Sequence, residues 1–432
     1  MQSIQERFAS RLAPLSLVAW RDRIRGALAR MAFWLSDVFV SRHGSRTRTI
    51  HLAMRIWGFL SKKTFLAITW LDDSTPTMRL ADAESGISVA PTLAGRSDVK
   101  SVTLPAIALY ALRDVTLAAG APAFASNGGI LIERVPDVEV SRCSFVGGPV
   151  LAHGNSFAAI PRRRSVALKR GFFLASYGYA NWYHWMIEIL PKLRYWQELA
   201  PALRAYPLLV GEDIVDQTAF LEALTAFAAD AEIAVLKKDE LYTVGHLLHI
   251  NSPNPSPVNL RGSHQMRVTD FFMRPSAIQD WRQRVGRDSL QKSSPGRQIF
   301  LARAHDRRPY NQSEVLDMFG EAGFEPVYFD QMSLREQIDT MASARMIAGP
   351  TGAAWANLIF CTPGAQALCW MAEPYREYSA YSTIAHIVGV DLRYLTYATT
   401  ARSTGDLYAT GYQLDMATLE RELAGLLADA AG

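Results

Sequence analysis

The sequence predicts an α/β protein built from two parallel-sheet halves that face each other across a cleft. Apolar segments of strand length alternate with segments of helical period in two blocks, at residues 171–250 and 298–395. A proline-punctuated loop at residues 251–257 separates the blocks, as expected where a chain crosses between domains. This alternation favours Rossmann-like halves, which bind ligands beyond the carboxyl ends of their strands.

Residues 1–63 form a predicted basic amphipathic arm. They contain 12 Lys/Arg against three acids, a charge of +9, and the rest of the chain has −5 within the net charge of +4. The basic excess therefore belongs to the amino terminus and does not indicate a nucleic-acid-binding body. Basic residues alternate with large apolar ones such as Trp20, Leu28 and Trp34. This pattern suits an interfacial helix on an anionic membrane, or equally an arm that packs on this chain or on a second subunit.

Residues 64–165 form a predicted β-rich region in which short apolar segments recur between turn signals. The clearest turn is Asn127-Gly128-Gly129. The expected strands are at residues 102–104, 106–112, 115–117, 129–132 and 138–140. We expect no chemistry in this region.

Two α/β halves follow, at residues 166–262 and 263–432. In the first, we expect strands at residues 171–176, 206–210, 232–236 and 241–250, and helices at 181–199 and 217–227. The second should begin with a helix at 264–286. Its expected strands are at 298–302, 325–329, 346–348, 366–371 and 392–395, with helices at 333–344, 353–360 and 379–388. Asn311 with Glu314 three residues later predicts a capping box before a further helix.

Composition is typical of a globular chain with a large core. The 432 residues are 49% hydrophobic and 20% charged. No run of about 20 apolar residues is present, so we expect no membrane-spanning helix. The apolar segment at residues 12–20 is too short, and too closely followed by arginines, for a cleavable signal. Cys143, Cys361 and Cys369 have no metal-like spacing, and Cys361 and Cys369 are interpreted as buried thiols, which suggests a reducing compartment.

The first candidate site lies on the helix expected at residues 181–199. His184 and Glu188 are four residues apart and share a helix face with Asn181. A carboxylate one turn from a histidine orients the ring and raises its basicity, so the pair could act as acid and base. The alternative is an ordinary amphipathic helix whose polar groups pair at the surface.

The second candidate site follows the strand at residues 298–302. Arg303, Arg307 and Arg308 would lie at the carboxyl end of that strand. Guanidinium groups bind phosphate oxygens bidentately and stay charged, which suits a diphosphate. The alternative is a solvated basic loop.

The third candidate site is the strand–turn–helix unit at residues 346–360. Its Gly-Pro-Thr-Gly turn at residues 349–352 precedes a helix that contains Asn357. Such a unit attracts anions because backbone N–H groups and a positive helix end come together. The spacing matches neither a dinucleotide fingerprint nor a P-loop. We find no HExxH, Asp-x-Asp or Cys/His cluster, so nothing supports a metal-dependent mechanism.

In this order and spacing the three sites resemble glycosyltransferase family 61, which includes many bacterial capsular-polysaccharide biosynthesis proteins. The first family segment is matched by NWYHWMIEILPKL, with Glu188 where Asp is usual. The arginine segment is matched by RAHDRRPYNQ, with Gln312 in place of Glu, and a Gln-containing helix by SLREQI with Gln337. The last is matched by GPTGAAWANLIF, except that Thr351 replaces a histidine.

The resemblance implies a GT-B fold and an inverting, metal-independent transfer from a nucleotide sugar to an oligosaccharide or glycolipid acceptor, without a cofactor. Together with the basic arm, it leads us to expect a cytoplasmic enzyme of cell-surface or capsular polysaccharide biosynthesis, peripheral on the inner face of the membrane. His184 would be the base with Glu188 as its orienting partner, or the roles would be reversed. Asn181 and Trp185 would lie in the cleft or on the acceptor side. The implied donor-binding residues are Arg303, Arg307, Arg308, Gly349, Thr351, Gly352, Ala353 and Asn357.

Two other functions fit the same features. A non-catalytic protein could retain the fold and bind glycan or a second transferase. A pyruvyl or phosphoryl transferase could use the same anion-binding cleft.

Overall fold

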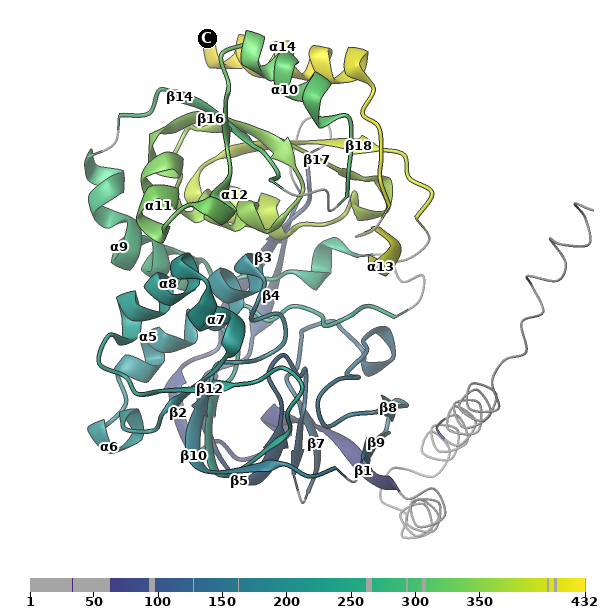
Figure 1. Cartoon of the computed structure of the whole chain (residues 1–432), viewed down its shortest axis with the longest axis vertical. Helices are drawn as coiled ribbons and strands as arrows, with labels where there is room; N and C mark the ends of the chain where they lie inside the picture. Colours follow the sequence, from purple (N-terminus) through teal and green to yellow (C-terminus); the bar gives the residue numbers. More distant parts are fainter. Residues whose placement is uncertain are drawn as a thin grey trace, which may run out of the picture.

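The computed structural model describes residues 33, 63–92, 98–126, 128–161, 163–261, 266–292, 294–304, 308–401, 404–407 and 410–431. The predicted arm lies outside this part of the chain, apart from Phe33 and the strand residue Lys63, and so do Asn127 and Arg307. The described residues form an amino-terminal half, residues 63–261, and a carboxy-terminal half, residues 266–431. Figure 1 shows the carboxy-terminal half in green and yellow above the other.

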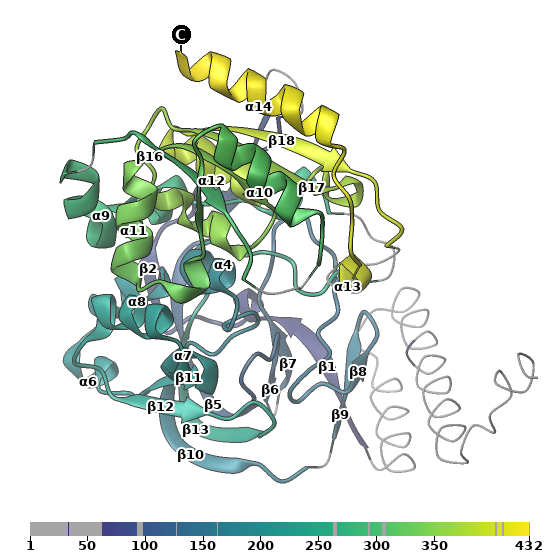
Figure 2. The same ribbon diagram turned by 45° about the horizontal axis from the view of Figure 1, so that its top comes forward.

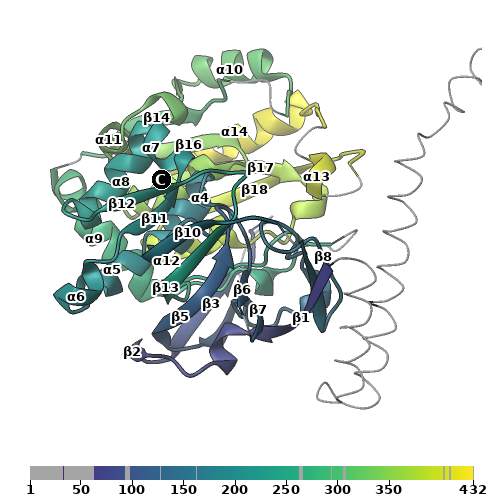
Figure 3. The ribbon, with the colours of Figure 1, turned by 60° about the horizontal axis from the view of Figure 1, so that its bottom comes forward.

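Eleven strands of the amino-terminal half form one sheet, in the order β12-β11-β10-β13-β5-β6-β7-β1-β9-β8 with β2 beside β5. Figure 3 shows this sheet with β5, β6 and β7 toward the viewer. The bounds are β1 (Lys63–Trp70), β2 (Met78–Ala81), β5 (Ile107–Leu117), β6 (Phe124–Ser126), β7 (Gly129–Ile132), β8 (Ala152–His153), β9 (Phe157–Pro161), β10 (Val166–Phe173), β11 (Leu208–Gly211), β12 (Ile233–Leu236) and β13 (Tyr242–Ile250).

The parallel part of this sheet confirms the first predicted α/β block. β10, β11, β12 and β13 follow in the chain but lie in the order 12-11-10-13, so the order reverses between β10 and β13. The helices are α4 (Trp182–His184), α5 (Lys192–Gln197), α6 (Pro201–Arg204), α7 (Glu212–Asp216) and α8 (Thr218–Ala228). β13 also pairs antiparallel with β5. The β-rich region therefore continues the same sheet, and the predicted boundary at residue 165 falls between β9 and β10.

Two predictions for the β-rich region were wrong. The strands expected at residues 106–112 and 115–117 form the single strand β5, because pairing with β13 continues on both sides of Asp114, which takes a positive φ of 50°. The strand expected at 138–140 does not form, and a 3₁₀ turn, Val140–Arg142, begins there. This turn places the Arg142 guanidinium 2.6 Å from the buried Asp270 carboxylate, a bond that an extended chain here would not favour.

The carboxy-terminal half has a separate sheet of five parallel described strands in the order β15-β14-β16-β17-β18. Its order reverses between β14 and β16. The bounds are β14 (Arg297–Leu301), β15 (Glu325–Val327), β16 (Ala344–Pro350), β17 (Gln366–Ala372) and β18 (Asp391–Tyr397). The helices are α9 (Pro275–Lys292), α10 (Gln312–Glu321), α11 (Leu334–Ser343), α12 (Ala380–Val388), α13 (Thr404–Leu407) and α14 (Met416–Ala431). Figure 2 shows α14 along the outer side of this sheet.

Two helix predictions in this half change. α9 starts at Pro275 rather than 264, since proline is well placed in the first turn of a helix and a 3₁₀ turn, Val268–Asp270, precedes it. The capping box predicted at Asn311 is absent, because its amide bonds the backbone N–H of Leu414 and the Glu314 carboxylate. A capping box is found instead at Ser333 and Glu336, before α11.

A two-stranded ribbon joins the halves. β3 (Glu84–Val89) and β4 (Val99–Leu104) pair with each other and leave the first sheet, and Figure 1 shows them rising between the halves. The backbone N–H of Val89 donates to the Thr383 hydroxyl of α12 at 2.9 Å, and the Ser382 hydroxyl donates to the Val89 carbonyl at 2.6 Å. The amino-terminal half is thus bonded directly to a helix of the other half.

Phe33 is the part of the predicted arm whose side chain the structure describes. It is buried, and its ring lies 5.8 Å from that of Phe65 on β1. This residue therefore packs on its own chain. Among the described helices, none has both the length and the apolar character that crossing a membrane requires.

Candidate active site

A cleft of about 1050 Å³ lies between the two halves. Its walls come from the segments that follow the parallel strands, for example Tyr177 after β10, Asn259 after β13, Arg303 after β14 and Gly352 after β16. Both reversals of strand order open into this cleft. It is therefore where a ligand is expected in sheets of this kind.

The helix that carries the first candidate site is not a regular α-helix. Asn181 caps it, with its side-chain oxygen accepting from the Tyr183 N–H at 2.9 Å. After α4 the chain forms a π-helical turn, Trp185–Ile189, in which the N–H of Leu190 reaches the carbonyl of Trp185 at 2.9 Å. π-helical turns are rare in proteins as a whole, but many of those that occur lie at functional sites.

Pro191 and the loop at residues 251–257 explain how this turn is stabilised. Proline has no N–H to give to the carbonyl of Ile187, four residues earlier. The Asn254 amide donates to that carbonyl instead, at 2.8 Å, and the Ser252 hydroxyl donates to the carbonyl of Glu188 at 3.0 Å. The loop thus supplies the hydrogen bonds that the helix backbone lacks, which the sequence analysis missed.

His184 and Glu188 are in contact, as their spacing predicts. His184 Nδ1 lies 2.9 Å from Glu188 Oε2, and the Ser256 hydroxyl donates to Glu188 Oε1 at 2.6 Å. The His184 side chain is 21% exposed and lines the cleft, while Glu188 lies behind it. Burial acts to lower the pKa of His184, but the Glu188 charge and hydrogen bond outweigh it, so this pKa is raised from its ordinary value. When neutral with Nδ1 protonated, the ring leaves Nε2 as a proton acceptor.

A second charged group lies behind this pair, beside a cavity of about 80 Å³ that Glu188 also lines. The Glu133 carboxylate lies 2.7 Å from His249 Nε2 and 3.3 Å from Lys192 Nζ, and it accepts from the Ser252 N–H at 2.7 Å. Burial acts to raise the pKa of Glu133, but the charge of Lys192 and these hydrogen bonds lower it overall. Lys192 is 1% exposed, so Glu133 balances a buried charge.

Arg303 and Arg308 line the cleft at the end of β14. Arg303 donates from Nη2 to the carbonyl of Thr351 at 2.7 Å, and from Nη1 to that of Arg308 at 3.0 Å. Arg303 therefore connects the loop that follows β14 to the turn that follows β16, where the strand order reverses. Arg308 has a positive φ of 59°, an uncommon conformation for arginine that is typical of functional loops. Arg307 lies outside the described residues.

Some residues of the turn at 349–352 line the cleft, and others pack against the neighbouring strand β14. Thr351, Gly352 and Ala353 line the cleft. Gly349 does not line the cleft and faces β14 instead. A Cβ at this position would lie 2.8 Å from that of Leu301, so the glycine lets β14 and β16 approach closely. The helix at Ala353–Phe360 has the predicted bounds but is a 3₁₀ helix. The implied role of Gly349 in donor contact is thus not supported by its position.

The donor-binding role implied for Asn357 is also not supported, because its side chain is fully buried. It accepts from Trp182 Nε1 at 2.8 Å and donates to the Gln337 side-chain oxygen at 2.8 Å. Gln337 in turn donates to the carbonyls of Phe329 and Met332. Asn357 therefore connects the helix of the first site to the loop after β15 and does not reach a ligand.

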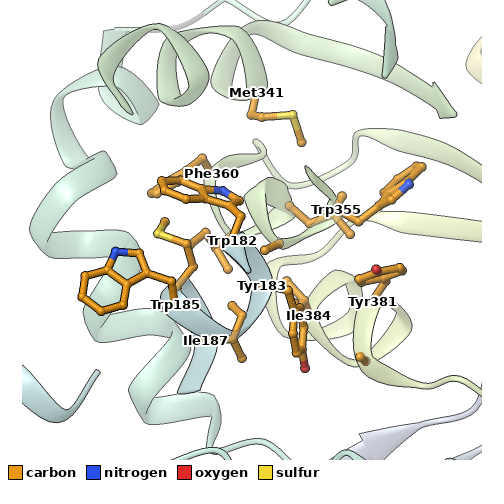
Figure 4. Close-up of a cluster of buried hydrophobic side chains, with 14 of the residues drawn as sticks. Trp182, Tyr183, Trp185, Ile187, Met341, Trp355, Phe360, Tyr381 and Ile384 are labelled. Atoms are coloured by element: carbon orange, nitrogen blue, oxygen red, sulfur yellow. The ribbon is translucent and has the colours of Figure 1, made fainter. Parts of the chain in front are cut away.

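Trp185 does not lie in the cleft either. It is fully buried and stacks near Phe220, with ring centroids 6.1 Å apart. Figure 4 shows its side chain directed away from Trp182, Tyr183 and Trp355, which gather where the two halves meet. The π-helical turn and the neighbouring helix α8 provide the space for Trp185. Asn181 does line the cleft, at its exposed rim.

Two further observations concern metals and thiols. In the described part of the chain, no group of three or more His, Cys, Asp or Glu is placed to hold a metal ion. Cys143, Cys361 and Cys369 are buried and form no disulfide, which confirms the predicted burial of Cys361 and Cys369.

The comparison with protein families identifies one match. The family model described as Glycosyltransferase 61 matches residues 182–368, from α4 into β17. The match confirms the family resemblance found in the sequence, and it contains the residues of the three candidate sites except Asn181. No curated protein matches the chain.

Proposed function

The chain carries a glycosyltransferase 61 domain at residues 182–368, and we propose that it transfers a sugar from a nucleotide sugar to a hydroxyl group of an oligosaccharide or glycolipid. The main support is that the candidate base His184 and the cations Arg303 and Arg308 line one cleft from opposite halves. Sugar transfer needs both, since a hydroxyl must lose a proton while a diphosphate leaves with negative charge. Two facing α/β halves of this kind suit the GT-B arrangement.

The proposed reaction inverts the anomeric centre. The acceptor oxygen forms a bond to the anomeric carbon as the bond from that carbon to the diphosphate oxygen breaks. The hydroxyl proton passes to His184 Nε2, and the leaving nucleoside diphosphate takes the electron pair of the broken bond. Glu188 holds Nδ1 and stabilises the imidazolium that forms.

The donor diphosphate is proposed to bind at the reversal between β14 and β16. Arg308 would offer its guanidinium there, together with the start of the 3₁₀ helix at Gly352 and Ala353. Arg303 and Arg308 both donate to the carbonyl of Thr351, at 2.7 and 3.4 Å, so both would set the shape of the turn as well as supply charge. Thr351 occupies the position of the family histidine, and its side chain would meet the donor.

We further propose that transfer needs neither metal nor cofactor and serves capsular or other cell-surface polysaccharide biosynthesis. The +9 charge of residues 1–63 would hold the enzyme on the inner face of an anionic membrane. Flotation with anionic vesicles tests this contact. Binding at low salt that fades at high salt is expected, and a full-length chain that ignores the vesicles at low salt would contradict it.

A donor screen tests the function. Wild-type protein is mixed with UDP-, GDP- and dTDP-sugars in EDTA, and melting temperature and nucleotide release are measured. We expect at least one donor to raise the melting temperature and to be turned over, with His184→Ala slowing turnover about 10²–10⁴-fold at unchanged donor affinity. The control is His246→Ala, which alters an exposed histidine on β13 outside the cleft. Binding without turnover would indicate a non-catalytic partner, and turnover only with added manganese would refute the metal-free mechanism.

A further inference from the structure

The turn at Thr351 and Gly352 divides the cleft into two arms. β14 and β17 flank β16 on opposite sides, so the segments that follow them lie on opposite sides of the turn that ends β16. The segment after β14 supplies Arg303 and Arg308 to one arm, and the segment after β17 supplies Tyr375 and Tyr378 to the other. We name these the cationic arm and the aromatic arm.

Each arm continues onto the amino-terminal half. The N–H of Leu334 donates to the Glu222 carboxylate at 2.7 Å, which places α8, after β11, against α11, after β15. On the other side, the ring of Tyr183, after β10, lies 6.1 Å from that of Tyr381, after β17, and the ring of Phe271 lies 4.7 Å from that of Tyr378. The segment after β10 therefore faces the segment after β17. The aromatic arm is lined by Tyr177, Ser256, Asn259, Phe271, Tyr375 and Tyr378, with smaller contributions from their neighbours.

Tyr378 is the centre of this arm. Phe271 and Tyr381 meet its ring edge to face, at centroid distances of 4.7 and 4.9 Å and interplanar angles of 75° and 81°. Tyr375 lies 6.0 Å away. Those three neighbours are buried, whereas Tyr378 is half-buried and lines the cleft. The surrounding rings thus hold one aromatic side chain in a fixed orientation with part of its surface open to the cleft.

The chemistry of the aromatic arm suits a neutral sugar. A pyranose ring presents C–H groups that pack on an aromatic ring, and hydroxyl groups that need donors and acceptors at its edge. Ser256, Asn259 and Tyr177 supply such polar groups. None of the described residues that line this arm carries a charged side chain. A carboxylated or phosphorylated sugar would find no arginine or lysine there, with His184 at the edge of the arm as the nearest titratable group.

The aromatic arm also lies on the side of the proposed base. The His184 ring is 5.6 Å from that of Tyr177, and Tyr177 donates its hydroxyl to the Asn259 side chain at 2.7 Å. Ser256, which lines the same arm, bonds Glu188. A hydroxyl bound in the aromatic arm would therefore lie close to the group that takes its proton.

From these observations we propose that the aromatic arm is the acceptor subsite and that it takes an uncharged sugar ring packed on Tyr378. This inference rests on the proposed function, with the donor diphosphate in the cationic arm. It assigns a specificity-determining role to a tyrosine outside the segment matched by the family model.

Saturation-transfer NMR on the wild-type protein tests the subsite without any turnover. The probes are methyl β-cellobioside, methyl β-lactoside and methyl β-xylobioside as neutral glycosides, methyl β-glucuronide as a charged one, and UDP and GDP. We expect signals from a neutral glycoside that persist when the diphosphate is added, because the two occupy different arms. Displacement of the glycoside by diphosphate, or preference for the glucuronide, would overturn the assignment.

Variants of Tyr378 give the second test. Tyr378→Leu should weaken the glycoside signal and raise the acceptor KM about 2- to 13-fold, since an aromatic face is worth about 0.5–1.5 kcal/mol beyond its area and about 1.4 kcal/mol is a factor of ten. Tyr378→Phe keeps the ring and should retain binding, and Tyr206→Leu, on a ring that packs under Arg170 away from the cleft, is the matched control. Hydrolysis of donor without acceptor should change less than about twofold.

The outcomes separate this inference from the proposed function. Unchanged glycoside binding and acceptor KM in folded Tyr378→Leu would refute the subsite, and so would a loss of UDP or GDP affinity in that variant. If Tyr378→Leu does not fold, the competition experiment on the wild-type protein still decides. If no nucleotide sugar is turned over but the ring-dependent glycoside binding is found, the function fails and the subsite stands.

Discussion

Replacing Glu188 with Gln should slow sugar transfer and move the acidic limb of its pH–rate profile to lower pH. Glu188 Oε2 lies 2.9 Å from His184 Nδ1, and its charge is what raises the pKa of the partly buried ring. Without that charge, burial alone remains and acts to lower the pKa of His184. The ring then stays neutral to lower pH, which shifts the limb in that direction.

The size of the rate effect follows from the same contact. A hydrogen bond to a charged group contributes about 1.5–3 kcal/mol. Because about 1.4 kcal/mol is a factor of ten in rate, its loss should reduce kcat about 10- to 150-fold. His184→Ala removes the base itself and should cost about 10²–10⁴-fold. Donor affinity should be unchanged in both variants, since neither side chain lies in the cationic arm.

The assay is kcat/KM and kcat from pH 5 to 9 for wild type, Glu188→Gln, His184→Ala and the exposed control His246→Ala. An acidic limb that stays in place in Glu188→Gln would show that His184 is not the group that titrates. If Glu188→Gln abolishes turnover while His184→Ala keeps most of it, the carboxylate is the base. Near-full activity in both would mean that the pair belongs only to the helix surface.

Three further predictions concern stability, measured by urea unfolding. Asn357→Leu leaves the buried side chains of Trp182 and Gln337 without their hydrogen-bond partner and should lower the free energy of unfolding by about 1–3 kcal/mol for each of them. A variant as stable as the wild type would refute the role of Asn357 as a connector. Gly349→Ala places a Cβ 2.8 Å from that of Leu301 and should cost about 1–3 kcal/mol by forcing β14 and β16 apart, whereas Gly320→Ala, with open space around it, should not. Glu133→Gln leaves the buried charge of Lys192 unbalanced and should cost about 3–5 kcal/mol. The pKa of Glu133 is lowered in the fold, so this stabilisation exists above the ordinary carboxyl pKa of about 4.3 and fades as pH falls below it; a difference that persists unchanged at pH 2 would contradict this explanation.

Features set by local spacing could be predicted from the sequence. The contact of His184 with Glu188 follows from a helical repeat, and the position of Arg303 at a strand end follows from strand–helix alternation. The bounds of the helix at Ala353–Phe360 were also confirmed. In each case the residues that decide the structure are close together in the chain.

Features set by distant segments could not be predicted. Asn357 is buried because Trp182 and Gln337 reach it from two other segments, and no local pattern indicates either contact. The π-helical turn needs Asn254, far along the chain, to bond a carbonyl that Pro191 leaves open. Trp185 shares the motif of His184 but packs into the core because its direction changes within that turn. The aromatic arm likewise comes from separate segments that follow β10, β13 and β17.

The β3–β4 ribbon limits how the cleft can widen. Its strands leave and re-enter the amino-terminal half, while its tip at Val89 is bonded to Ser382 and Thr383 of the other half. A rigid swing of one half away from the other must either break these bonds or turn about them. Together with the bond from Trp182 to Asn357, these contacts join the halves at more than one place and resist such a swing.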